Sequence, residues 1–171
     1  MSKIVNEAKV KFPLFVKVRE QLEHRALWMY LLVDEAKKRG LDDSFAEAAI
    51  RRCGNIHGDL HVAAGKTTSL KGLRKVLFTK SAQIVFEMDV VECTDDKLSI
   101  DFHYCPLVKA WQKQGCSDEE IERLCDLAMC GDRGIGESFG VELDLPKTIA
   151  RGDDCCAIRY IRRQGSAESR G

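Results

Sequence analysis

The stretch KLSIDFHYC, residues 97–105, is the point at which the hydrophobic pattern of the chain changes from a helical period to an extended one. Side chains of a strand alternate between two faces, so this segment has one apolar and one polar face. The apolar face holds Leu98, Ile100, Phe102 and Tyr104, and the polar face holds Ser99, Asp101, His103 and Cys105. With VFEMDVVEC at residues 85–93 and the turn sequence TDDK between them, the segment predicts a β-hairpin.

The chain before this hairpin has the spacing of helices. Residues 13–39 repeat apolar positions every three or four residues and end in a Lys-Lys-Arg run before Gly40, which suits a helix C-terminus. Asp42 or Asp43 is suited to cap a second helix through about residue 63. A third helix is expected to start near Ser69 and to run into the low eighties.

The chain after the hairpin alternates between helix and strand signals. Pro106 opens a short helix, and Ser117 with Glu120 forms a capping box for a helix that should end at Cys130, before Gly131. The glycines of GDRGIGESFG, residues 131–140, then favour a turn. Two further strands are predicted, VELDL at residues 141–145 and CCAIRYI at residues 155–161.

Together these elements predict one α+β domain over residues 1–161, in which N-terminal helices precede a mostly antiparallel sheet of about four strands with packed helices. The tail RRQGSAESRG, residues 162–171, has the composition of a disordered segment. A chain of 171 residues can bury one sizeable core, and two independent domains would be cramped.

Composition narrows the classes of partner. Lys+Arg and Asp+Glu both number 27, so the chain has no net positive charge that would attract nucleic acid or an anionic membrane. The N-terminus lacks the apolar core of a signal peptide, and no stretch approaches the roughly 18 apolar residues of a membrane span. We expect a cytoplasmic protein that acts on a small molecule and that could form a homo-oligomer. Its eight cysteines should then be reduced, and most of them should fill the core.

One candidate metal site lies on the second predicted helix. Cys53, His57 and His61 follow at intervals of four residues and share a helix face, and thiolate and imidazole suit zinc. However, ligands spread over two turns span about 12 Å, so one ion could reach only two of them. Cys53 also continues the apolar stripe of Phe45, Ala49 and Ile56, which favours a core position.

A second candidate is the polar face of the hairpin strand. Asp101, His103 and Cys105 alternate along it at about 6.6 Å, a spacing at which two groups could grip one small ligand. A solvated outer face is the alternative interpretation. Cys125 falls in the stripe of Ile121, Leu124 and Ala128, which indicates a core position.

The adjacent Cys155 and Cys156 cannot share one environment. On a regular strand Cys156, Ile158 and Tyr160 share one face, whereas Cys155 and Arg159 share the other. Adjacent cysteines form only strained disulfides, so a redox pair is not expected.

The second half of the sequence resembles the L-2-amino-thiazoline-4-carboxylate hydrolase-like family. The matching features are a cysteine after a strand, an amphipathic helix, a Glu-Glu helix that ends in Leu-Cys, an Asp seven residues on, and a closing G-x-x-x-C on a strand. The resemblance covers roughly residues 98–161. The residues that match it are Cys105, Cys125, Asp132 and Cys156, with Arg159 behind them. Ala157 stands where the family commonly has an acid.

The resemblance implies a hydrolase that opens a cyclic C–N bond in a sulfur-containing, amino-acid-like substrate, without a cofactor. Attack at the ring carbon requires a nucleophile, a proton carrier and a cation for the substrate carboxylate. Cys105 or Cys156 is the candidate nucleophile and His103 the candidate acid/base, with Asp132 as a further catalytic residue. Arg159 is the candidate carboxylate clamp, although it lies on the opposite strand face from Cys156, and Asp101 and Cys125 are candidate substrate-binding residues.

A second resemblance keeps a different class of function open. The closing Gly-x-x-x-Cys strand is similar to 4-vinyl-reductase-type ligand-binding domains, some of which hold zinc through cysteines and an acid. This alternative predicts a non-catalytic small-molecule or metal-binding module, with zinc as its cofactor.

Overall fold

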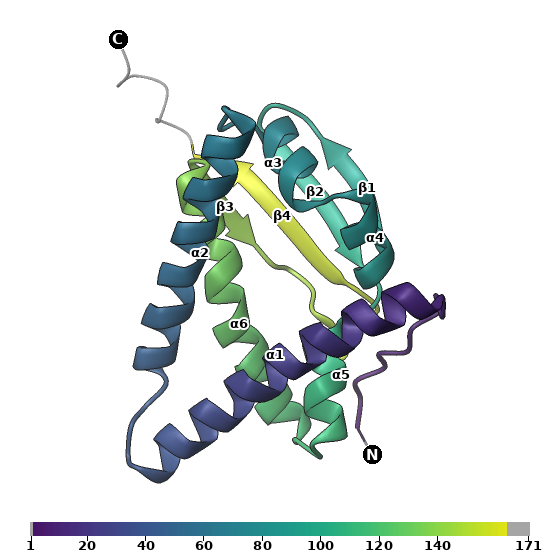
Figure 1. The fold of residues 1–171 in the computed structure, drawn as a ribbon, viewed down its shortest axis with the longest axis vertical. Helices are drawn as coiled ribbons and strands as arrows, with labels where there is room; N and C mark the ends of the chain where they lie inside the picture. Colours follow the sequence, from purple (N-terminus) through teal and green to yellow (C-terminus); the bar gives the residue numbers. More distant parts are fainter. Residues whose placement is uncertain (1, 164–171) are drawn as a thin grey trace.

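A computed structural model describes residues 2–163, and this part of the chain contains six α-helices, one 3-10 turn and four strands (Figure 1). The helices are α1 (Pro13–Lys38), α2 (Ser44–Gly65), α3 (Leu70–Leu77), α4 (Lys80–Phe86), α5 (Pro106–Lys113) and α6 (Asp118–Ser138). The strands are β1 (Met88–Cys93), β2 (Lys97–Phe102), β3 (Val141–Asp144) and β4 (Cys156–Arg162), and the 3-10 turn η1 spans Ile149–Arg151. The sheet has the order β1-β2-β4-β3 and is antiparallel throughout. The α+β prediction and the four-strand antiparallel sheet are confirmed.

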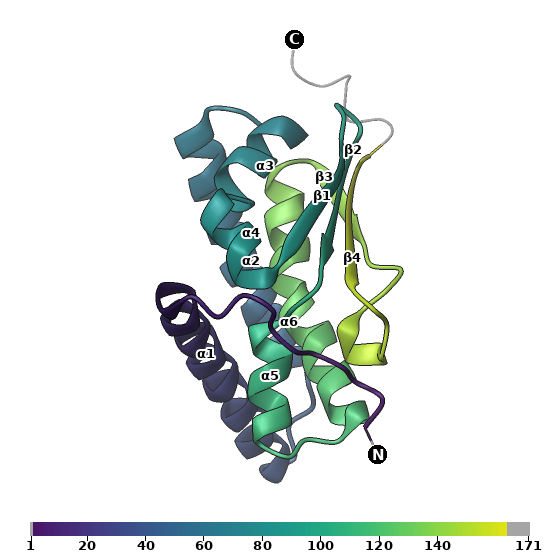
Figure 2. The same ribbon diagram turned by 90° about the vertical axis from the view of Figure 1, so that its right-hand side faces the viewer.

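The sheet carries its helices on one face, as Figure 2 shows. Leu98, Ile100 and Phe102 of β2 stand opposite Tyr160, Ile158 and Cys156 of β4, and all six point to the helical side. The intervening residues form the outer face, where Ser99 stands opposite Arg159. The period-two pattern of the sequence therefore gives the correct faces for β2 and β4.

The predicted hairpin is present but shorter than expected. Val85 and Phe86 belong to α4, so β1 begins only at Met88. β2 ends at Phe102, so the alternation predicted to extend to Cys105 is wrong beyond that residue. The reason is that the backbone N–H groups of His103 and Tyr104 bond to the carbonyl groups of Glu87 and Phe86 at the end of α4, which turns the chain out of the β2–β4 ladder.

The predicted third helix is in fact two helices. α3 ends at Leu77, and Thr79 adopts an extended conformation in which its side chain accepts a hydrogen bond from the Ala82 N–H group. Thr79 is therefore an N-cap that starts a new helix, α4. An internal Thr is compatible with either helix interior or cap, so the periodicity alone did not reveal the break.

α6 does not end at Cys130 but continues for two more turns, so the turn predicted for residues 131–140 is wrong. These glycines instead allow α6 to touch α2 at the level of the backbone. A Cβ atom on Gly54 of α2 would lie 2.0 Å from the carbonyl oxygen of Gly131, and one on Gly134 would lie 2.4 Å from the carbonyl oxygen of Arg51. Helix–helix contacts this close exclude any side chain, which accounts for glycine inside a helix despite its low propensity.

A buried arginine joins α1 to α4 and to the N-terminal segment. Arg19 donates through Nε to the Val85 carbonyl at 2.8 Å and through Nη1 to the Val10 carbonyl at 2.5 Å. Its Nη2 lies 3.0 Å from Oε1 of Glu87, and its guanidinium stacks 4.5 Å from the centre of the Tyr104 ring. A fully paired buried cation of this kind fixes where the carbonyl end of α4 meets α1.

The ends of the domain also differ from the prediction. β4 continues to Arg162, so this residue belongs to the sheet rather than to the predicted disordered tail. The rest of that prediction, residues 164–171, lies outside the described residues. Within residues 2–163, none of the helices combines the length and the apolar character that a membrane crossing needs.

The glycine contact between α2 and α6 can be tested with a matched pair of substitutions. Gly134→Ala should lower the free energy of unfolding by about 1–2 kcal/mol, because overpacking against fixed backbone outweighs the gain in helix propensity. Gly131→Ala is the control, since its Cβ would lie at an ordinary 3.5 Å from Ile50. It should be neutral or stabilising by up to about 1 kcal/mol in urea unfolding. Equal effects of the two substitutions would contradict the close approach.

Candidate functional site

Three cysteines from three different elements meet in the core beneath the sheet. Cys105 precedes α5, Cys125 lies in α6 and Cys156 begins β4. Cys125 and Cys156 are buried in one hydrophobic cluster, and Cys105 packs against the same cluster but keeps partial exposure. Cys105 and Cys156 both act electrostatically on the Cys125 thiol, and Cys105 also acts on that of Cys156. The structure thus brings together the three cysteines that match the family pattern.

Cys105 is held in place by its backbone. The side chain of Asn6, which is buried, donates to the Cys105 carbonyl at 2.8 Å and accepts from the Cys105 N–H group at 2.9 Å. Pro106 then opens α5, and the backbone N–H groups of Leu107 and Val108 at this helix start lower the pKa of the thiol. The free N–H groups of a helix start favour negative charge, so they partly offset the effect of burial on this thiol.

Cys156 is held by the tight turn that precedes β4. The Ile149 N–H group donates to the sulfur of Cys156 at 3.3 Å. The turn itself is closed by Thr148, whose N–H group donates to Asp153 at 2.8 Å and whose hydroxyl accepts from the Arg151 N–H group at 3.2 Å. The Gly-Asp pair in this part of the sequence therefore shapes the loop that positions Cys156.

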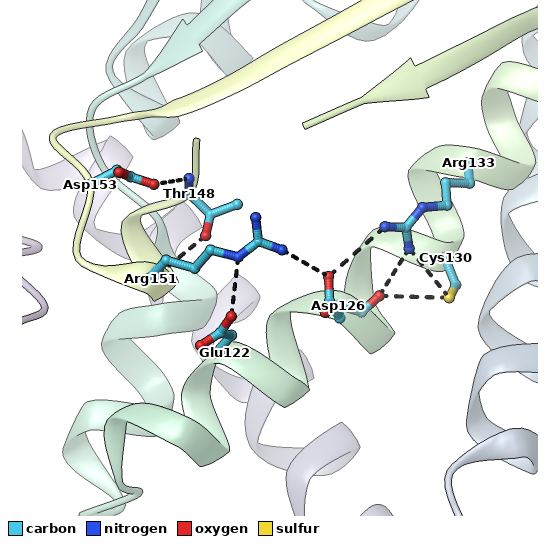
Figure 3. A network of polar contacts seen from close by, with 7 residues as sticks. All are labelled: Glu122, Asp126, Cys130, Arg133, Thr148, Arg151 and Asp153. Carbon is cyan, nitrogen blue, oxygen red and sulfur yellow. Dashed lines mark hydrogen bonds and ion pairs between the residues drawn. The ribbon is translucent and has the colours of Figure 1, made fainter. Parts of the chain in front are cut away.

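Salt bridges fasten this turn to α6, as Figure 3 shows. Arg151 donates through Nε to Glu122 at 3.1 Å, and its guanidinium lies 4.0 Å from Asp126. Arg133 approaches Asp126 from the other side, at 3.9 Å, and also donates to the Asp126 carbonyl at 3.2 Å. These pairs are partly exposed, so each contributes little stability alone, but together they fix η1 on the helix that carries Cys125.

Asp132 is the acidic group of the site. It lies seven residues after Cys125, two turns along the same face of α6. Burial raises the pKa of its carboxyl group to about 6, although Arg25 and Arg133 favour the ionised form. The hydroxyl of Tyr160 donates to the Asp132 carbonyl oxygen at 3.2 Å. A carboxyl group whose pKa lies this close to neutrality can both accept and return a proton.

Burial raises the pKa of the three thiols as well, but it moves them away from neutrality. Burial raises the pKa of Cys105, raises that of Cys125 well above its usual value, and raises that of Cys156 to about 12. The thiolate of Cys105 raises the pKa of Cys125 and Cys156 further, and the charge of Asp132 raises that of Cys105 and Cys125. At neutral pH the thiols are therefore protonated, and attack by any of them requires a partner that takes the proton.

Arg25 of α1 is a site residue that sequence reasoning missed. It is exposed, but its charge lowers the pKa of both Asp132 and Cys105, which places a cation beside the acid and the thiol. No motif marks it. The one available signal was its position next to Ala26, which belongs to the apolar helical pattern of residues 13–39. In the structure Ala26 is deeply buried, and its carbonyl accepts a hydrogen bond from Trp111.

Three predicted site residues lie elsewhere, so the proposed polar strand face is wrong. Asp101 and Arg159 form a salt bridge of 2.6 Å on the outer face of the sheet, away from Cys156. His103 is exposed and pairs with Asp89 at 3.0 Å, in an open groove of about 600 Å³ that also contains Lys9. Because β2 ends before His103, neither His103 nor Cys105 continues the face of Asp101.

The second predicted helix does not gather a metal site. The rings of His57 and His61 lie 6.5 Å apart and Cys53 is exposed. In residues 2–163 no three His, Cys, Asp or Glu side chains form a group that could hold a metal ion, the cysteine site included. The stripe of Phe45 and Ile56 that favoured a core position for Cys53 is also exposed, because the glycine side of α2 faces the core instead.

The raised pKa of Asp132 predicts a dependence of stability on pH. The carboxyl group ionises near pH 6 in the folded protein and near its ordinary 3.8 when unfolded, so its contribution is full below pH 3.8 and is lost as the pH rises through 6. Relative to Asp132→Asn, the wild type should lose about 3 kcal/mol between about pH 4 and pH 7. Thermal unfolding of both proteins across this range measures the difference, and a constant difference would contradict the shift.

Comparison with known proteins adds three findings. The chain is similar in fold to a trafficking protein particle complex subunit 3 from Naegleria fowleri, solved covalently bound to palmitic acid, with a TM-score of 0.54 and 17% sequence identity. The match covers 83% of this chain and 95% of that one, and at this identity it shows the fold alone. No curated protein has significant sequence similarity to the chain. The family model for L-2-amino-thiazoline-4-carboxylic acid hydrolase matches residues 19–160, a span that contains Arg25, Asp132 and the three site cysteines, and the chain therefore belongs to this family.

Proposed function

We propose that the protein is a hydrolase that opens a cyclic C–N bond in a sulfur-containing, amino-acid-like substrate such as an aminothiazoline carboxylate. The observation that carries this proposal is the pairing of Asp132, whose pKa burial raises to about 6, with the neutral thiol of Cys105. Membership of the hydrolase family supports the reaction class. The proposal needs no cofactor.

Cys105 is the proposed nucleophile because it alone of the three site cysteines keeps partial exposure, and because the N–H groups at the start of α5 lower its pKa. Its sulfur forms a bond to the ring carbon between nitrogen and sulfur, and its proton passes to Asp132. Asp132 then delivers this proton to the ring nitrogen as the C–N bond breaks. Water hydrolyses the new C–S bond and returns a proton to Cys105, so that one water molecule is added overall.

Arg25 is the proposed partner of the substrate carboxylate, in place of Arg159. Its side chain is exposed and no salt bridge to it is formed in residues 2–163, whereas Arg159 is already paired with Asp101. A guanidinium can bind a carboxylate through two parallel hydrogen bonds, which would also orient the ring. Cys125 and Cys156 would then form the apolar wall against which the ring packs.

A non-catalytic module that binds a small molecule is the second candidate. It is favoured by the burial that keeps all three thiols protonated, because a binding pocket needs no proton carrier. The structural neighbour, a subunit of a trafficking protein particle complex, was solved covalently bound to palmitic acid. Such a module would bind the aminothiazoline without opening its ring.

Three substitutions test the proposed reaction on an aminothiazoline carboxylate. Asp132→Asn and Cys105→Ser should each lower kcat by about 10²–10⁴-fold, because the proton acceptor or the nucleophile is lost. Arg25→Gln should act mainly on KM, with kcat/KM falling about 10–100-fold, since a charge-assisted hydrogen bond to substrate is removed. The rate of the wild type should rise with pH through about 6 as Asp132 ionises.

Cys53→Ser is the matched control, since Cys53 is exposed on α2 and should leave turnover unchanged. Activity that survives in Asp132→Asn would contradict the proposed proton carrier. Substrate binding in calorimetry without ring opening by the wild type would contradict the hydrolase and favour the binding module. Elemental analysis of the purified protein provides a further check, because stoichiometric zinc would contradict a reaction that needs no cofactor.

A further inference from the structure

One face of α2 is largely apolar, with Arg52 between Ala49 and Ile56 at its middle, and its apolar residues have no partner in the described part of the chain. Phe45, Ile56 and Leu60 are 41%, 53% and 62% exposed, and Ala49 between them is exposed as well. Leu41, in the loop that precedes α2, is 56% exposed as well. We call Leu41, Phe45, Ala49, Ile56 and Leu60 the α2 stripe.

The α2 stripe is a consequence of how α2 packs. Gly54 and Gly58 lie on the side of α2 that contacts α6, where both are buried. The stripe residues occupy the opposite side of the helix, as Figure 1 shows for the outward position of α2. Isolated exposed apolar residues are ordinary, but a run of them over four turns of one helix marks an interaction surface.

We propose that the α2 stripe is the interface between two copies of this chain, paired antiparallel across a twofold axis. Phe45 and Leu60 are equally distant from the point between Arg52 and Cys53, and so are Ala49 and Ile56. A twofold axis at that point places Phe45 against Leu60 of the second copy, and the small Ala49 against the larger Ile56. The stripe is therefore complementary to itself, as an isologous contact requires.

The apolar area fits a dimer of modest size. The exposed fractions of Leu41, Phe45, Ile56 and Leu60 amount to roughly 400 Å² per copy if a large side chain presents ~200 Å². Two copies would therefore bury ~800 Å² of apolar surface. A stable interface of ~1,200 Å² that is ~65% apolar buries about the same apolar area. The α2 stripe lies outside the cysteine site, so a dimer formed through it is independent of the proposed reaction.

Sedimentation velocity of the purified chain tests the proposal. The wild type should sediment as a dimer of a 19.2 kDa chain, and Ile56→Glu should weaken association at least ~100-fold because it buries an unpaired charge. Val91→Glu is the control, since Val91 is 59% exposed on β1, outside the stripe. It should leave the dimer intact, and far-UV circular dichroism should show that both variants are folded.

Crosslinking provides a second readout, because Cys53 is the one exposed cysteine among the eight and lies beside the proposed axis. Helices in contact lie 8–10 Å apart, so a short bismaleimide should join the two copies of Cys53 in the wild type but not in Cys53→Ser. A wild type that sediments as a monomer at every concentration, or a dimer that survives Ile56→Glu, would overturn the proposal. The stripe would then be a binding surface for a different protein.

Discussion

The backbone contact between α2 and α6 is the constraint on which the candidate site depends. Gly54 and Gly134 allow the two helices to approach so closely that α6 continues past Cys130 to Ser138. Asp132 lies in this continuation, on the side of α6 that also carries Cys125. Without the close approach, the chain from Gly131 would be free to turn away, and the acid would not lie beside the thiols.

Burial then gives the site its chemical character. The same apolar surroundings raise the pKa of Asp132 to about 6 and that of Cys156 to about 12, so the acid titrates near neutrality while the thiols stay protonated. Desolvation disfavours the charged form of both the carboxyl group and the thiols. Their pKa values in the site differ because their ordinary pKa values differ. Arg25 is the one nearby cation that acts on both Asp132 and Cys105, and it moderates the shift of each.

The sequence predicted the sheet well because its faces depend on a local period. Leu98, Ile100 and Phe102 point inward as the alternation requires, and Cys156 and Arg159 lie on opposite faces. The match to a family pattern also brought Cys105, Cys125, Asp132 and Cys156 forward, and the structure brings these four together. The burial of Cys125 followed from its helical stripe alone.

The errors arose where long-range contacts override a local signal. Gly131 and Gly134 have the composition of a turn, and only the presence of α2 makes them helical. His103 was assigned to the site from the alternation of the strand, and Arg159 from the match to the family pattern. The end of β2 and the salt bridge to Asp101 place them outside it. Arg25 could not be found from motifs, since its role follows from how α1 crosses the core.

The central claim is that Asp132 is a half-buried proton carrier beside Cys105, and its own titration tests this most directly. Carbon-13 NMR of the Asp132 carboxyl group, assigned with Asp132→Asn, should give a pKa of about 6, and Arg25→Gln should raise it further because a nearby cation is removed. A pKa near the ordinary 3.8, unchanged by Arg25→Gln, would contradict the account.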